Sequence, residues 1–360
     1  AEARMIEYGK LFEELHILTL TRKSMGFEDK KIAQNVWAYS TNSGSKLGMV
    51  FDAIRMGKRI VFEKKFVRGL SVITAQDPFE TGFVGMRIKN KWRIPLHIQL
   101  HTDPFSPFFS GFLNSIRKRM ARSVLKKANG VRVVSESLAV EVLKKFALDQ
   151  EKMMVLPIYT EPSRIENEQV KFDLHARFGW NFILLAVSRL TVEKNIPMML
   201  NVFKKLIGFF PNIGLVIVGD GPEKNSLESL VKSLKLENNV AFVGWQEDLA
   251  SYYKTANMFI QTSNFEGYGL SLVEAGLSGL PVVTTAVGIA NDLENGKDAY
   301  VCPPGNEEYM FKAVYDLVEN NSKREELKIR IKHTLESKLL SKVDYMEKYK
   351  TMLEKASKIS

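Results

Sequence analysis

The sequence predicts an α/β protein made of two consecutive halves, each built on a mostly parallel sheet. Strand-length apolar runs alternate with helix-patterned segments in both halves, which is typical of parallel sheets covered on both faces. A polar, aperiodic stretch at 159–169, which contains Pro162, separates the halves. The chain of 360 residues is also longer than one hydrophobic core usually serves, so two domains are expected.

The first half opens on a helical pattern, not on a strand. We expect its strands at 16–20, 36–40, 70–75, 96–100, 131–135 and 153–157, and its helices at 44–63, 81–91, 110–128 and 136–146. A parallel α/β domain normally begins with a strand in the middle of its sheet, so we expect this half to lack its first strand. A neighbouring chain would be one way to fill such a gap, which leaves a homodimer open.

The second half restarts the same alternation. We expect strands at 182–187, 215–218, 240–243, 258–260 and 282–284, and helices at 195–209, 222–236, 248–255 and 269–278. The remaining segment, 307–359, is helical and charged throughout, with turns near Asn320 and Ser341.

Composition excludes several classes of protein. No apolar run approaches the roughly 18 residues of a membrane span, and no signal peptide opens the chain, so a cytoplasmic protein is expected. The single Cys302 excludes an intramolecular disulfide and a cysteine-based metal site. Residues 1–165 carry 28 Lys and Arg against 16 Asp and Glu, so the net charge of +10 belongs to the first half. Nucleic acid, anionic lipid and phosphorylated substrates all suit such a surface.

Loops that follow strands are where ligands bind in open α/β sheets. The loop NFEGYGLSLVE, after the strand at 258–260, carries Glu266 and Glu274 eight positions apart. Its Gly267 and Gly269, which flank Tyr268, let backbone N–H groups approach a phosphate beside a helix N-terminus. Carboxylates would repel phosphate, so they indicate a ligand with hydroxyls, such as a sugar or a ribose.

The loop SRLTVEKN, after the strand at 182–187, holds Arg189 and Lys194 close to a helix start. Two cations converging there would neutralise a diphosphate, and the alternative is a solvated loop. The loop GDGPEK contains Gly219 and Asp220, but Lys224 breaks the G-x-G-x-x-G fingerprint, so a nicotinamide oxidoreductase is poorly supported. That loop is equally well explained as a plain turn.

Two further loops carry candidate ligand contacts. In GWQED, Trp245 with Gln246 would offer a flat surface to a nucleotide base, although an ordinary buried tryptophan is the simpler interpretation. His101, directly after the strand at 96–100, is placed to hydrogen-bond a sugar hydroxyl, and a structural histidine paired with Asp103 is the alternative.

Residues 105–127 combine phenylalanines with a basic amphipathic segment. Phe112, Ile116, Met120 and Val124 recur in steps of four on one helix face, opposite basic residues. Such a segment would rest on an anionic membrane surface, but a helix packed on its sheet gives the same pattern. No nucleic-acid-binding signature accompanies the charge, so nucleic acid is not expected.

Metal and P-loop chemistry are not expected. The sequence has no Asp-x-Asp, no cysteine cluster, no histidines at ligand spacing and no G-x-x-x-x-G-K-[ST]. A bound diphosphate would then be neutralised by Arg189, Lys194 and helix dipoles, without a metal cofactor.

With these motifs in place, the chain resembles the retaining family 4 glycosyltransferases, whose fold is GT-B. The E-x7-E motif is matched by Glu266 and Glu274, and the run EAGLSGLPVV follows it. By this resemblance Glu266 would hold the donor sugar near its reacting carbon and Glu274 the nucleotide ribose. Gly269 and Leu270 would offer N–H groups to the phosphates, Arg189 and Lys194 would bind the diphosphate, and His101 would face the acceptor.

The resemblance implies two Rossmann-like domains facing each other across a cleft: 1–160 for the acceptor, 161–340 for the nucleotide sugar, and a helix at 341–360 returning to the first. It implies transfer from a UDP-, GDP- or ADP-sugar to a glycan or lipid-linked acceptor, with retention and without metal. A non-catalytic, nucleotide-binding protein and a GT-B sugar-nucleotide epimerase are the alternatives.

Overall fold

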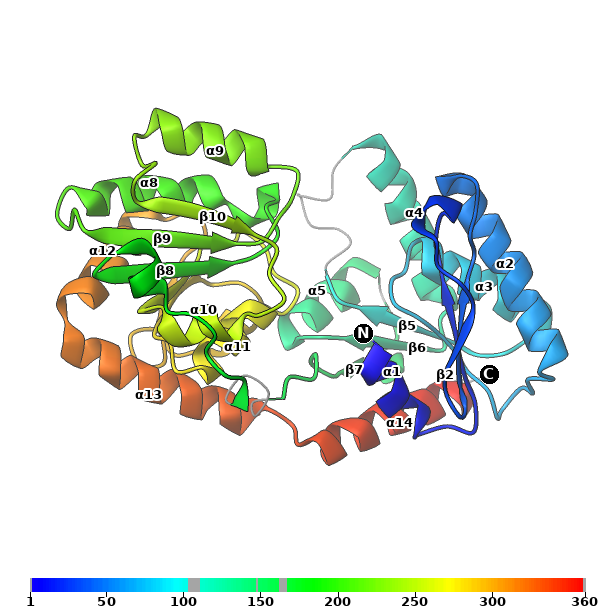
Figure 1. The fold of residues 1–360 in the computed structure, drawn as a ribbon. Helices are drawn as coiled ribbons and strands as arrows, with labels where there is room; N and C mark the ends of the chain where they lie inside the picture. Colours follow the sequence, from blue (N-terminus) through cyan, green and yellow to red (C-terminus); the bar gives the residue numbers. More distant parts are fainter. Residues whose placement is uncertain (1, 103–110, 147, 162–166, 359–360) are drawn as a thin grey trace. The chain divides into compact units, whose positions relative to one another are not determined.

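The computed structural model of the protein describes residues 2–102, 111–146, 148–161 and 167–358. The chain divides into two compact units (Figure 1). Unit 1 comprises Ala1–Pro157 with Ser341–Ser360, and unit 2 comprises Ile158–Leu340. Both units are α/β with mostly parallel sheets, as the alternation of strands and helices predicts.

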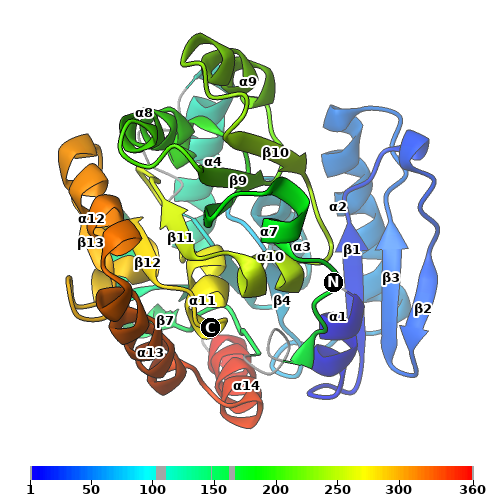
Figure 2. The same cartoon turned by 60° about the vertical axis from the view of Figure 1, so that its left-hand side comes forward.

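Unit 2 contains one six-stranded parallel sheet of order β10-β9-β8-β11-β12-β13. Helices α8, α9 and α12 pack on one face, and α10 and α11 lie on the other with α13 against α11 (Figures 1 and 2). The strands are β8 (Phe182–Val187), β9 (Ile213–Val218), β10 (Val240–Gly244), β11 (Met258–Gln261), β12 (Val282–Thr285) and β13 (Tyr300–Cys302). The helices are α7 (Leu174–Phe178), α8 (Ile196–Ile207), α9 (Lys224–Ser233), α10 (Ala250–Thr255), α11 (Leu270–Leu277), α12 (Glu307–Glu319) and α13 (Asn321–Lys338).

The two central strands of this sheet determine where a ligand binds. Every residue of β11 is buried, and so are the first five of β8, because helices cover both faces. The chain proceeds from β8 to one edge of the sheet through β9 and β10, then returns to β11 and proceeds to the other edge. The strand order therefore reverses between β8 and β11, and the carboxyl ends of this pair form the topological switch point where ligands bind.

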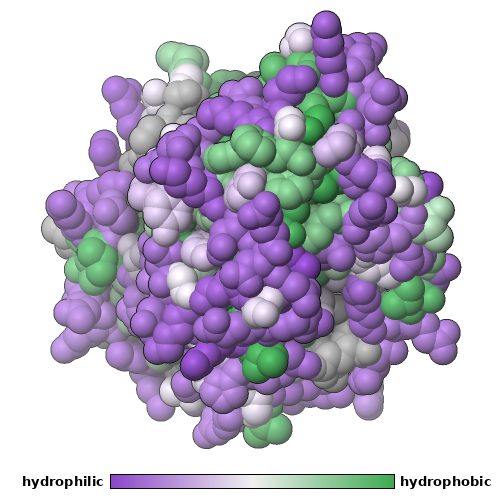
Figure 3. All heavy atoms as spheres, turned by 90° about the vertical axis from the view of Figure 1, so that its left-hand side faces the viewer, coloured by the Kyte–Doolittle hydropathy of each residue, from purple (hydrophilic) through white to green (hydrophobic). Residues whose placement is uncertain are grey.

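The outer helices of unit 2 present a mostly hydrophilic surface. Figure 3 shows one apolar area among hydrophilic side chains on the face that it turns to the viewer. Phe209, just after α8, is 61% exposed and packs ring against ring with Phe210, Phe311 and Tyr315. Because α8 runs back from the carboxyl ends of the strands, this aromatic cluster lies at the end of unit 2 away from the switch point.

Unit 1 contains two sheets instead of the single sheet we expected. The first has the order β1-β3-β2, with β2 antiparallel, and the second is parallel with the order β4-β5-β6-β7. The first sheet consists of β1 (Leu15–Thr19), β2 (Lys30–Ala33) and β3 (Val36–Ser40). The second consists of β4 (Ile73–Ala75), β5 (Leu96–Leu100), β6 (Gly130–Val133) and β7 (Met153–Val155). The short strand β2, which pairs locally with β3, was not anticipated.

Shared helices join these two sheets into one unit. Leu18 of the first sheet and Ile73 of the second pack against the same core, which contains Val61 and Ile88. Strand β1 lies at an edge of the first sheet and β4 at an edge of the second, and no described strand pairs with both of them. The helices are α1 (Glu2–Gly9), α2 (Lys46–Glu63), α3 (Glu80–Trp92), α4 (Phe112–Lys127), α5 (Glu136–Phe146) and α14 (Lys342–Lys358).

The C-terminal helix α14 packs on β5 and β6 through a buried polar network. Arg132 of β6, only 3% exposed, donates to the carbonyls of Leu156 and Pro157 at 2.8 and 2.6 Å and to the Tyr345 hydroxyl at 2.9 Å. It also donates to Gln99 Oε1 at 2.8 Å. One guanidinium therefore ties α14 to the last residues of unit 1 before the chain enters unit 2.

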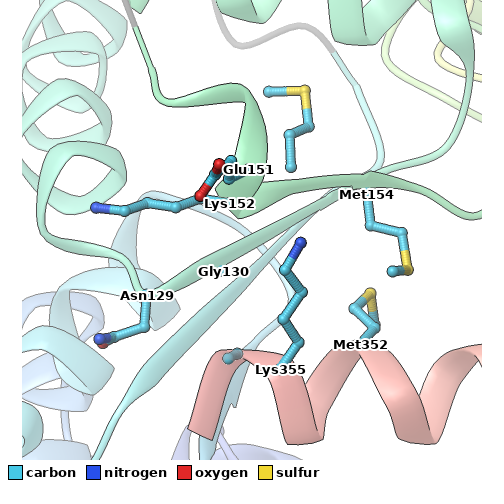
Figure 4. A pocket seen from close by; sticks show the side chains of 9 residues that line it. Asn129, Gly130, Glu151, Lys152, Met154, Met352 and Lys355 are labelled. Atoms are coloured by element: carbon cyan, nitrogen blue, oxygen red, sulfur yellow. The ribbon is translucent and has the colours of Figure 1, made fainter. Parts of the chain in front are cut away.

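A shallow pocket lies beside α14, at the end of the β4-β5-β6-β7 sheet opposite to the one that carries Leu156 and Pro157. Figure 4 shows Met352 of α14 facing Met154, and Lys355 extending from α14 toward the strands; Asn129 and Lys152 also line the pocket. Residue Gly130 begins β6 and Met153 begins β7, so this pocket lies at the amino ends of the strands, opposite the end where ligands bind in such sheets.

Among the described residues no helix combines the length and apolar character needed to cross a bilayer.

Candidate functional site

The switch point of unit 2 holds a partly buried ion pair between Lys194 and Glu266. Lys194 ends a short 3-10 turn after β8, and Glu266 lies in the loop after β11. Because these strands are neighbours, the two loops meet, and Lys194 Nζ lies 2.6 Å from Glu266 Oε1. Their side chains are only 14% and 11% exposed. A cation and a carboxylate that lie 72 positions apart in the sequence are thus held together where a ligand would bind.

Neighbouring hydroxyls hold this pair in place. Ser263 donates from Oγ to the same Glu266 oxygen at 2.8 Å. Thr262 donates from Oγ1 to the carbonyls of Lys194 and Asn195 at 3.1 and 3.0 Å. The sequence arguments missed Ser263 and Thr262, and their only signal is a polar Thr-Ser pair directly after a buried apolar strand.

Helix α11 begins in this loop and directs its N-terminus to the site. Gly269 adopts φ of 98°, a left-handed conformation that favours glycine. Tyr268 is 5% exposed, burial raises its pKa to about 12, and its carbonyl accepts from Ile289 N at 2.7 Å. The first amides of α11, from Leu270 on, carry the positive end of the helix dipole and suit an anionic group. Gly267, in the same loop, is also buried.

Glu274 lies one turn into α11 and is held by a tyrosine from another helix. The hydroxyl of Tyr253, on α10, donates to Glu274 Oε2 at 3.1 Å. Tyr253 is fully buried, and burial followed by the nearby Glu274 charge raises its pKa well above the usual value. The tyrosine therefore stays a neutral donor and holds one carboxylate oxygen. Nothing in the sequence points to Tyr253, which lies 21 positions before its partner.

Arg189 and the Gly219 loop contribute differently from what we expected. Arg189 is 73% exposed and lies 3.6 Å from Glu193, so the structure does not bring it onto the Lys194 pair. Gly219, with φ of 135°, packs so closely on Ser188 that an added Cβ would lie 1.9 Å from its carbonyl oxygen. The Asp220 side chain accepts from the next backbone amide at 2.8 Å. This glycine thus permits close packing of two loops, and Asp220 closes the turn.

The loop after β10 presents Trp245 to solvent. Trp245 is 69% exposed, so the simpler interpretation, an ordinary buried tryptophan, is wrong. Gln246 folds back and donates from Nε2 to the Val243 carbonyl at 2.7 Å. The exposed indole ring lies at the carboxyl end of an edge strand, on the same end of the sheet as Lys194.

His101 belongs to unit 1, at the end of β5. It is half-buried, its Nε2 lies 3.3 Å from Gln76 Oε1, and burial lowers its pKa to about 4, with Arg132 and Arg4 adding to the shift. The alternative partner, Asp103, lies outside the described residues. Residues 105–110 of the basic segment also lie outside them.

The rest of the basic segment forms α4, which packs by only part of its apolar stripe. Val124 is fully buried, but Phe112 and Ile116 are 81% and 44% exposed. The first turns of α4 therefore extend apolar side chains into solvent, while its later turns cover the sheet. In the described ranges no three His, Cys, Asp or Glu side chains gather as metal ligands.

The chain contains two Rossmann-like units, and one of them holds a cation and carboxylates at its switch point. This arrangement is that of the GT-B class of glycosyltransferases. The family model described as glycosyl transferases group 1 matches residues 170–334, and the model described as glycosyltransferase family 4 matches residues 13–164. Together they cover both units, and the chain belongs to the family 4 glycosyltransferases.

One curated relative is similar to the chain in sequence, and two solved structures share its fold. Over 242 residues the chain is 30% identical to alpha-monoglucosyldiacylglycerol synthase of Streptococcus pneumoniae, covering 63% of this chain and 54% of that protein. The chain therefore spans about half the length of this relative. Sucrose-phosphate synthase from Thermosynechococcus elongatus is 17% identical with a TM-score of 0.79, covering 96% of this chain and 92% of that one. HepE of Anabaena, in complex with UDP and glucose, is 20% identical with a TM-score of 0.76, covering 98% and 95%.

Proposed function

We propose that the chain transfers a hexosyl group from a nucleoside-diphosphate sugar to an acceptor hydroxyl, with retention of configuration and without a metal. The partly buried Lys194–Glu266 pair at the switch point carries this proposal. In the reaction the acceptor oxygen bonds to the anomeric carbon, the bond from that carbon to the diphosphate breaks, and the nucleoside diphosphate leaves with the proton of the acceptor hydroxyl. Stabilising the leaving charge in a closed site is the main catalytic requirement, because fixed charges act more strongly there than in water.

The side chains around the switch point have separate roles in this proposal. Lys194, oriented by Glu266, and the first amides of α11 neutralise the diphosphate. Glu266 contacts the transferred sugar and Glu274 the ribose, while exposed Trp245 stacks on the base. Arg189 has a long, exposed side chain, which contacts the diphosphate only when the donor is bound.

The relatives support a choice of donor base and acceptor. HepE is described with UDP and glucose, which favours UDP-glucose over GDP- and ADP-sugars. The S. pneumoniae relative is named for a glucosylated diacylglycerol, which favours a lipid-linked acceptor over a free glycan. A cytoplasmic enzyme bound peripherally to a membrane fits such an acceptor. A homodimer stays a prediction.

The proposal is tested by product analysis. Purified protein is incubated with UDP-, GDP- and ADP-glucose and with diacylglycerol or glycan acceptors, and nucleotide release and anomeric configuration are followed by NMR. We expect UDP release, an α-linked product and an unchanged rate in a chelator. A β-linked product or loss of activity in chelator would contradict the mechanism, and an epimerised nucleotide sugar without transfer would assign a different reaction.

Replacing Tyr253 by Phe is expected to weaken UDP binding about tenfold, because a charge-assisted hydrogen bond contributes roughly 1.5 kcal/mol. This loss of affinity should be absent for 2′,3′-dideoxy-UDP, because it arises from the contact of Glu274 with the ribose hydroxyls, which the analogue lacks. Tyr252→Phe is the matched control: Tyr252 is equally buried on α10, but its ring packs edge-on against Phe172 at 5.0 Å. Calorimetry measures all four combinations, and an equal loss for both nucleotides would contradict the positioning role.

The pH dependence tests the placement of His101. Its pKa of about 4 means that the imidazole is neutral from pH 5.5 to 8, and protonation begins only as the pH falls toward 4. We expect kcat/KM to show no inflection from this group near pH 6.5. An inflection there that disappears in His101→Asn would contradict the burial described above.

A further inference from the structure

The shallow pocket beside α14 gathers positive charge at the amino ends of the strands of unit 1. Lys152, directly before β7, and Lys355, on α14, both line it (Figure 4). Lys89 of α3 reaches the same place, because its Nζ donates to Lys127 O at 2.6 Å and to the side chain of Asn129, which also lines the pocket. Three ammonium groups from three elements therefore lie around one opening.

The chain itself compensates these charges poorly. Burial lowers the pKa of Lys89, and the nearby charges of Lys152 and Lys127 lower it further, so the lysines repel one another. Glu151 is the one carboxylate that lines the pocket, and it is exposed. Within the described ranges no acidic side chain pairs with Lys152 or Lys355. An anion in the pocket would relieve this repulsion.

A buried histidine beside the pocket lacks one hydrogen-bond partner. His97 of β5 is fully buried, and its Nδ1 lies 3.2 Å from Thr74 Oγ1, but its Nε2 has no partner among the described residues. A Cβ added to Gly130 would lie 3.1 Å from His97 Cδ2 and 2.9 Å from the Cβ of Ala356. Because Gly130 and Ala356 line the pocket, the Nε2 edge of the ring lies next to it.

The hydrogen bonds around His97 make its Nε2 a donor. Gln99 donates from Nε2 to Thr74 Oγ1 at 3.1 Å, which leaves the threonine hydroxyl proton for His97 Nδ1. Burial, and then the charge of Arg132, lowers the pKa of His97 to about 3, so the ring is neutral and its one proton is on Nε2. A buried donor needs an acceptor, and an oxyanion supplies one.

We propose that this pocket binds the phosphate group of a small phosphate monoester. Lys152 and Lys355 contact the phosphate oxygens, and the Nε2 donor of His97 is the third polar partner. Met154 and Met352, which face each other in Figure 4, contact the apolar part of the ester. Because Lys355 belongs to α14 and Lys152 precedes β7, the bound phosphate also holds α14 on the sheet. The site is separate from the proposed transferase reaction, since it lies at the amino ends of the strands.

Calorimetric titration with phenyl phosphate and with inorganic phosphate, at constant ionic strength, tests the site. We expect one saturable site in unit 1 that prefers phenyl phosphate, with affinity at least tenfold lower in Lys152→Met/Lys355→Met. Lys144→Met/Lys348→Met is the matched control, because it removes two exposed lysines of unit 1, one of them on α14, that do not line the pocket. Lys194→Met should retain this binding, which separates the pocket from the switch point of unit 2.

Two further readouts locate the ligand. Phenyl phosphate should slow amide hydrogen exchange in α14 and shift the ¹⁵N resonance of His97 Nε2, and neither effect should occur in Lys152→Met/Lys355→Met. Circular dichroism shows that each variant is folded.

Four results would overturn the proposal. They are the absence of saturable binding, an equal loss in the control variant, equal affinity for the two phosphates, and binding that leaves α14 and His97 unchanged, which would mean an adventitious ion only. Loss of the phosphate site with normal sugar transfer, or the reverse, would separate this proposal from the transferase function.

Discussion

Lys194→Met is expected to lower kcat/KM for sugar transfer by about 10²- to 10³-fold, the usual loss when one preorganised charge is removed from a transition state. Lys194 is the cation of the proposed donor site, and its ammonium nitrogen lies 2.6 Å from Glu266 Oε1. Methionine keeps most of the side-chain volume, so the lost charge dominates the effect. The measurement is steady-state transfer with donor and acceptor varied.

The same variant should also be less stable. Removing Lys194 leaves Glu266, 11% exposed, with the Ser263 hydroxyl but without its cation. Breaking a fully buried pair costs about 3–5 kcal/mol, so we expect a loss of up to about 3 kcal/mol for this partly buried pair. Lys194→Met/Glu266→Gln should recover much of this stability and none of the activity. Lys297→Met is the control, because the Lys297–Glu294 pair is exposed and pairs of this kind contribute about 0–1 kcal/mol. Near-normal transfer in Lys194→Met would remove this residue from the site.

Arg132→Met is expected to lower the free energy of unfolding by about 3–5 kcal/mol. Arg132 is 3% exposed and makes four hydrogen bonds, so its loss strands buried acceptors on Leu156, Pro157 and Gln99. It also frees Tyr345 of α14, and hydrogen exchange should show this helix opening first. Urea denaturation followed by circular dichroism measures the change.

Arg87→Met on α3 is the control for this experiment. Arg87 is exposed in the same unit, so its replacement should change stability by less than about 0.5 kcal/mol. Equal stability of Arg132→Met and wild type would mean that α14 is held by its apolar contacts alone, including those of Met352 and Leu353.

The sequence contains enough information to bring Lys194 and Glu266 to the same end of the sheet, because parallel α/β folds obey a simple rule. The strands β8 and β11 are buried apolar runs, so they are recognised, and residues after such strands share one edge of the sheet. Lys194 and Glu266 were selected on this basis, and the structure brings them into contact. Helix caps such as Asn306 and Asn320 likewise explain why α12 and α13 begin where they do.

Features that depend on long-range side-chain contacts were not predictable. The Tyr253–Glu274 hydrogen bond joins two helices, and neither helix pattern marks which tyrosine bonds a carboxylate. The separation of unit 1 into two sheets depends on which strands pair, and hydrophobic runs do not encode pairing. Gly219 has the same sequence signature whether its backbone approaches a ligand or Ser188.

The central claim, that unit 2 holds a donor site built on Lys194, Glu266 and Glu274, is tested most directly by calorimetric titration with nucleoside diphosphates. UDP, GDP and ADP are titrated into the full chain and into Lys194→Met. We expect one saturable site that prefers UDP, with affinity at least tenfold lower in the variant. No saturable binding of any of the three nucleotides, or equal affinity in the variant, would contradict the account.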